Sequence, residues 1–153
     1  MDVNNINAVV DAMLSVIPQL GFESITKTGV KASGSFIQNP GVVINIGVIG
    51  QLKGSIVFLM DVDSAKKFAS KMMMGMEVNE FDEISQSALA EMSNIVCANA
   101  CTNLSQIGVN GLDISPPTLI FGKNGTIKVS APMIILLQFT VDDINMQLGV
   151  GLT

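Results

Sequence analysis

The stretch Val42-Val-Ile-Asn-Ile-Gly-Val-Ile-Gly-Gln-Leu-Lys-Gly-Ser-Ile-Val-Phe-Leu-Met60 decides the fold class of this 153-residue chain. Residues 42–49 are rich in β-branched side chains, and residues 55–60 form a second apolar run. Apolar runs of this length, rich in β-branched residues and separated by a short segment with glycine, are typical of paired strands. Because residues 51–54 supply the turn, the stretch predicts a β-hairpin.

Helical periodicity flanks this hairpin on both sides. Glycines mark the expected ends of the helices at Gly21, Gly75 and Gly108, and Asp63-Ser64 is a start signal for the second helix. In these segments apolar residues recur every three or four positions, as an amphipathic helix requires. The expected helices are 4–20, 65–74 and 80–107.

The remainder of the chain alternates apolar runs with turn residues. Asn124-Gly125 is a tight-hairpin signal, and Asp142-Asp143 is typical of a turn between strands. The expected strands are 118–121, 126–130, 133–140 and 144–152. The order of helix, strands, two helices and strands predicts one α+β domain over residues 1–153. Its antiparallel β-layer packs against two central helices and an N-terminal helix.

The composition excludes several classes of function. The chain has eight Lys but no Arg, His, Trp or Tyr, and its net charge is −5. The chain therefore lacks the excess of basic residues that a nucleic-acid-binding surface requires. Nucleophiles activated by histidine and histidine-based zinc sites are also excluded. Any chemistry must use carboxylates, amides, hydroxyls, lysines or thiols, and we expect no metal site of the chain's own.

The thiols and the N-terminus indicate a cytoplasmic protein. Cys97 and Cys101 lie four residues apart in a predicted helix, a spacing that suits packed thiols better than a disulfide. Residues 1–14 lack the basic start of a signal peptide, and no apolar run reaches the roughly 18 residues of a membrane span. We therefore expect inert thiols in a reducing compartment.

One face of the long predicted helix carries an unusual set of side chains: Ser87, Glu91, Asn94 and Ala98. Their spacing places them within roughly 60° of one another on a helix, opposite the apolar face formed by Leu89 and its neighbours. Glu and Asn on such a face are most often only solvated. The small Ser87 and Ala98 would nevertheless let another surface approach closely.

Ser87-x3-Glu91-x2-Asn94-x22-Pro117 resembles the signature of the bacterial chemotaxis phosphatases of the CheC, FliY and CheX group. That signature is Asp or Ser, three residues, Glu, two residues, Asn, twenty-two residues, Pro. The resemblance extends to residues 50–59 and 115–122, so it covers essentially the whole chain. The chain has one Glu-x-x-Asn motif and no second copy, and in this it resembles the CheX branch rather than the two-site CheC. Ala98 departs from the Gly common there, and its methyl group would slightly crowd a partner.

The resemblance implies a phosphatase that hydrolyses the aspartyl phosphate of a CheY-like response regulator. It implies that Asn94 holds the attacking water and that Glu91 pairs with the regulator's active-site lysine. Ser87, Ala98 and Pro117 would support or contact the partner. Mg²⁺ would come from the regulator's own active site, so this chain would need no cofactor. The resemblance further implies a homodimer formed through the β-layer.

Two other interpretations are compatible with the same residues. In the first, the domain binds a response regulator or a flagellar-switch component without catalysis. Binding without any change in the rate of dephosphorylation would distinguish it. In the second, the domain serves only for dimerisation, and the stripe from Ser87 to Ala98 faces water. Neither Asn94 nor Glu91 would then affect binding to a phosphorylated receiver.

Overall fold

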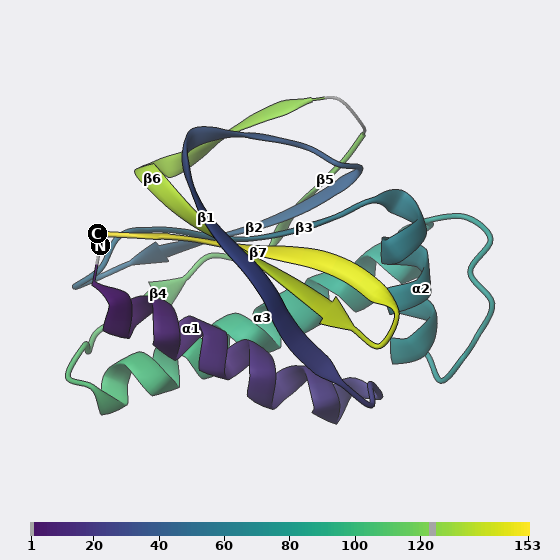
Figure 1. Ribbon diagram of the computed structural model, residues 1–153, viewed down its shortest axis with the longest axis horizontal. Helices are drawn as coiled ribbons and strands as arrows, with labels where there is room; N and C mark the ends of the chain where they lie inside the picture. Colours follow the sequence, from purple (N-terminus) through teal and green to yellow (C-terminus); the bar gives the residue numbers. More distant parts are fainter. Residues whose placement is uncertain (1, 123–124) are drawn as a thin grey trace.

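A computed structural model describes residues 2–122 and 125–153. In this part of the chain, helices cover one face of a seven-stranded antiparallel sheet, and α1 and α3 lie side by side (Figure 1). The helices are α1 (Val3–Val16), the 3-10 helix η1 (Ile17–Leu20), α2 (Val62–Met72) and α3 (Glu83–Gln106). The strands are β1 (Ile25–Gln38), β2 (Val42–Ile49), β3 (Gly54–Met60), β4 (Asp113–Ile114), β5 (Thr118–Phe121), β6 (Thr126–Val141) and β7 (Ile144–Leu152). This arrangement confirms the predicted α+β class.

The predicted hairpin forms the middle of the sheet. β2 and β3 pair from Val42 opposite Met60 to Val48 opposite Gly54. The strand order is β1-β6-β7-β3-β2-β4, and β5 also pairs with β2. All seven residues of β3 are buried. Because both faces of this strand are covered, its sequence from Ile56 to Met60 is continuously apolar rather than alternating.

The hydrophobic core has one part on each face of the sheet. The larger part lies between the sheet and the helices and includes Phe58 and Phe139, which are almost completely buried. On the opposite face, Ile37 and Val129 pack with Val57 in a smaller cluster. Ile37 lies near the C-terminal end of β1 and Val129 near the N-terminal end of β6. These two strand ends arch over the sheet in Figure 1. Both faces of the central strands are therefore shielded from water.

The helices end where predicted to within a few residues, with one correction to a cap. α2 begins at Val62, and its cap is Asp61, not Asp63-Ser64. The Asp61 carboxylate accepts the Ser64 N–H at 2.7 Å. Asp61 has extended backbone angles directly after β3, as a cap requires, whereas Asp63 already lies within the first turn.

Two strand predictions are also corrected. The sequence predicts no strand over residues 25–38, yet β1 spans 14 residues and pairs along its length with β6. β6 is one strand over Thr126–Val141 rather than two, although its pairing with β1 shifts register between Gly34 and Phe36. That shift loops out the segment containing Pro132, so the proline does not interrupt a ladder hydrogen bond. Asn124, the first residue of the predicted Asn124-Gly125 turn, lies outside the described residues.

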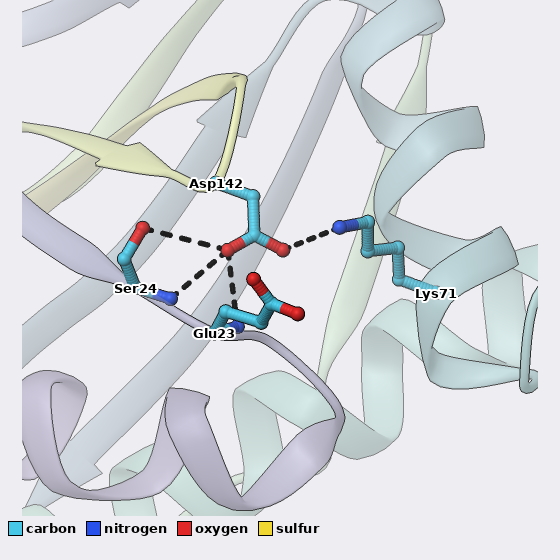
Figure 2. A network of polar contacts seen from close by, with 4 residues as sticks. All are labelled: Glu23, Ser24, Lys71 and Asp142. Carbon is cyan, nitrogen blue, oxygen red and sulfur yellow. Dashed lines mark hydrogen bonds and ion pairs between the residues drawn. The ribbon is translucent and has the colours of Figure 1, made fainter.

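Asp142 in the turn between β6 and β7 links three parts of the fold (Figure 2). One carboxylate oxygen accepts the N–H groups of Glu23 and Ser24 at 3.0 and 2.9 Å. The other oxygen accepts a hydrogen bond from the Lys71 ammonium of α2. The Lys71 hydrogen bond, and then that of the Ser24 N–H, hold the pKa of Asp142 below its ordinary value.

We expect Asp142→Asn to lower the Tm at pH 7, and the deficit to shrink as the pH falls. A depressed carboxyl pKa stabilises the folded state above the pKa of the unfolded chain, and this stabilisation is lost as the pH falls through the folded-state pKa. Asn suits the positive φ of 54° at this position, so the variant tests the charge rather than the backbone. Thermal melts from pH 7 to pH 2 measure the difference. Asp143→Asn, at the neighbouring exposed turn residue, is the control, and an equal deficit there would contradict the assignment to Asp142.

Candidate functional site

The candidate site lies on the solvent face of α3. Asp82 begins this helix, since its carboxylate accepts the N–H of Ser85 at 2.9 Å and the hydroxyl of the same residue at 2.7 Å. These bonds, the N–H bond first, lower the pKa of the Asp82 carboxyl. The side chains of Leu89, Met92 and Val96 are completely buried and fix which face of α3 points outward.

All four residues of the stripe on α3 are exposed, as the helical spacing predicts: Ser87, Glu91, Asn94 and Ala98. Three of them line an open hollow of about 470 Å³, together with Ala90 and the segment between β4 and β5. The complete lining is Ser87, Ala90, Glu91, Asn94, Ile114, Ser115, Pro116 and Pro117. Pro117, twenty-three positions after Asn94 in the sequence, thus shares this hollow. Ala98 lies one helical turn beyond Asn94 and does not line it.

Ser115 holds the Pro116-Pro117 wall of the hollow against the sheet, a role that the sequence alone does not predict. Its hydroxyl accepts the Gly47 N–H at 2.8 Å, and its own N–H donates to the Gly47 carbonyl at 2.9 Å. The same hydroxyl donates to the Pro116 carbonyl at 3.2 Å. A serine directly before two prolines was the available signal, but its partner Gly47 lies far away in the sequence, in β2.

The two thiols lie on α3 away from the hollow. Cys97 is buried and Cys101 is half-buried, and both are free. Burial raises the pKa of each thiol above its ordinary value. A raised pKa keeps a thiol protonated and weakly nucleophilic near neutral pH, so these groups are unsuited to nucleophilic catalysis.

The hollow offers a hydroxyl, a carboxylate and a carboxamide to an incoming surface. The carboxamide of Asn94 can both donate and accept hydrogen bonds, and Glu91 supplies a negative charge to the lining. Within residues 2–122 and 125–153, no group of three or more His, Cys, Asp or Glu side chains could hold a metal ion. In the same residues, no helix is both long and apolar enough to cross a membrane.

Two comparisons with known proteins point to the same family. The model of the family described as chemotaxis phosphatase CheX matches residues 42–139. A Thermotoga maritima protein named CheY-P phosphatase CheX is 34% identical over 155 residues, which cover 98% of this chain and 97% of that protein.

Solved structures show the same fold. A crystal structure of chemotaxis protein CheX from Vibrio vulnificus matches with a TM-score of 0.84 and 21% identity, covering 97% of this chain and 99% of that one. A CheX–CheY–BeF3–Mg²⁺ complex from Borrelia burgdorferi matches with a TM-score of 0.77 and 26% identity, covering 96% of each chain.

Proposed function

The chain belongs to the chemotaxis phosphatase CheX family, and we propose that it hydrolyses the aspartyl phosphate of a CheY-like response regulator. The observation that carries the proposal is the shared hollow of Ser87, Glu91, Asn94 and Pro117, which together make up the family signature. The name of the Thermotoga maritima relative supports the reaction, and the Borrelia burgdorferi complex supports the partner.

In the proposed reaction, the oxygen of a water molecule attacks phosphorus and the bond to the aspartyl oxygen breaks. The products are a free carboxylate, inorganic phosphate and a proton. Such a transfer depends mainly on positioning and charge neutralisation, and a carboxamide carried by a helix can supply the positioning. Asn94 would enter the regulator's active site and hold the water in line with phosphorus. Ser87, Ala98 and Pro117 would contact the regulator around it.

We assign Mg²⁺ to the regulator rather than to this chain. When bound there, the ion would neutralise charge on the phosphoryl oxygens. The support is the Mg²⁺ in the Borrelia burgdorferi complex, together with the neutral and acidic side chains of the hollow. Glu91 is the only carboxylate that lines it among the described residues, and one carboxylate is a weak Mg²⁺ site.

The decay of a phosphorylated CheY-like receiver, followed with Mg²⁺ present, tests the proposed function. Acceleration at substoichiometric amounts of this protein is the expected result, because a catalyst turns over. Binding without acceleration would overturn the phosphatase proposal in favour of a non-catalytic binding module. Absence of both binding and acceleration, with the receivers of the same cell, would leave only a structural role.

Glu91→Ala is expected to weaken the affinity for a receiver activated with beryllofluoride about tenfold and to lower turnover as well. Glu91 is exposed and lines the hollow, where its carboxylate can pair with the regulator's active-site lysine and fix the register of α3. Titration of the labelled receiver gives the affinity, and phosphate release gives the turnover. Asp11→Ala, which removes an exposed carboxylate from α1, is the matched control. Unchanged receiver affinity in Glu91→Ala would refute the lysine pairing.

We also propose that the chain forms a homodimer through its β-layer, which would give two equivalent sites. The support is the edge strand β1, whose Val30 and Phe36 are each 63% exposed. Large exposed apolar side chains on an unpaired edge favour pairing with another copy. Sedimentation velocity measures the state directly, and a monomer at all concentrations would contradict the proposal.

A further inference from the structure

An exposed apolar patch lies between α2 and the first turn of α3. It consists of Met74, Met76 and Ile84, whose exposed fractions are 98%, 64% and 68%. Met74 also has a left-handed backbone with φ of 61°, a conformation that a residue with a side chain rarely adopts. Large exposed apolar side chains that lie close together indicate an interaction surface.

The patch continues the stripe that carries the candidate site. Ile84 precedes Ser87 by three residues and Glu91 by seven, a spacing that places all three on one side of α3. Ile84 and Glu91 are both exposed. A partner lying along Ser87, Glu91 and Asn94 would therefore meet Ile84 at the N-terminal end of the same helix face.

Acidic groups surround the apolar centre of this surface. Met76 and Ile84 line a hollow of about 340 Å³ together with Met73, Glu77, Val78, Asn79, Glu80, Asp82 and Ser85. Its lining has three carboxylates and no lysine. A bound surface must therefore offer apolar groups next to positive charge, because a neighbouring acidic partner would be repelled.

We propose, on the basis of the proposed function, that Met74, Met76 and Ile84 form a second contact surface for the same response regulator. An apolar side chain of the regulator, flanked by Lys or Arg, occupies the hollow while Asn94 reaches the phosphoryl group. Methionine side chains are flexible and polarisable, so they adapt to partners of slightly different shape. The patch thus contributes affinity and selects among receivers, whereas Asn94 contributes the chemistry.

The test is the double variant Met76→Ser/Ile84→Ser, compared with Ile107→Ser. Ile107 is also an exposed isoleucine, 51% accessible, at the opposite end of α3. The double variant is expected to raise KM, and the Kd for the beryllofluoride-activated receiver, about tenfold, with kcat within about twofold of wild type. Ile107→Ser is expected to change none of the three. Far-UV circular dichroism melts verify that both variants fold.

A single reporter provides an independent measurement. The chain has no Trp or Tyr, so Met74→Trp introduces its only indole. Its emission is expected to shift to shorter wavelength when an activated receiver without tryptophan covers the patch, and Ile107→Trp is expected not to shift.

The outcomes separate this inference from the proposed function. Wild-type binding with an unchanged KM and Kd in the double variant would overturn the second contact surface alone. A fall in kcat with KM unchanged would also overturn it, because that pattern belongs to a group acting in the transition state. Wild-type protein that binds no receiver would overturn the proposed function, and this inference with it.

Discussion

Asn94→Ala is expected to reduce kcat for receiver dephosphorylation at least about 100-fold, which is the usual cost of removing one positioned polar group from a transition state. KM should change little, because the carboxamide acts on water and phosphorus rather than on the bulk of the interface. Asn94 is exposed on α3, and no hydrogen bond of its side chain to the described residues restrains it. The substitution therefore leaves the fold intact and removes only chemistry.

Phosphate release under single-turnover and steady-state conditions measures this loss. Gln106→Ala is the matched control, since it deletes an exposed carboxamide from the same helix outside the stripe. Near-normal turnover in Asn94→Ala would contradict the proposed role of the carboxamide. Loss of affinity without loss of kcat would assign Asn94 to binding instead.

Gly54→Ala is expected to destabilise the fold by more than about 4 kcal/mol, a large fraction of the stability of an ordinary domain. Gly54 has φ of 147°, and a Cβ at this position would overlap the Gly151 carbonyl oxygen of β7. Backbone atoms would have to move to relieve this contact. The pairing of Gly54 with Leu152 at the start of β3 would break as a result.

Urea unfolding followed by far-UV circular dichroism measures this effect. Gly34→Ala is the control, because a Cβ at that position would meet no atom within 4 Å and its φ is ordinary. That substitution is expected to stay within about 0.5 kcal/mol of wild type. Equal stability of the Gly54 and Gly34 variants would show that β3 and β7 can separate at this point without cost.

The sequence predicts the structure best in segments whose own pattern of apolar residues shows which side is buried. The hairpin over β2 and β3 is predictable because both strands are largely buried and are therefore mostly apolar. The exposed side of α3 is predictable because Leu89, Met92 and Val96 recur at helical spacing. The positions of Ser87, Glu91 and Asn94 follow from that periodicity alone.

The failures occur where a distant partner determines the structure. Only one residue of β1, Ile37, is fully buried, and the strand contains Gly29 and Gly34, so its sequence has no clear alternation. It is extended because it pairs with β6, about a hundred residues later. The wall formed by Pro117 likewise depends on the hydrogen bonds between Ser115 and Gly47, and no local pattern contains that pairing.

The position of β7 between β6 and β3 determines when the sheet can close as the chain is synthesised on the ribosome. The last strand to emerge is central in the sheet, and its Leu148, Val150 and Leu152 belong to the main core. Until residues 144–152 are available, the nascent chain presents the apolar β3 with an open edge. The helix with the candidate site can form before β7 is made, yet the sheet beneath it closes only once residues 144–152 have emerged. Until β7 is in place, the open apolar edge of β3 makes newly made chains prone to associate with one another.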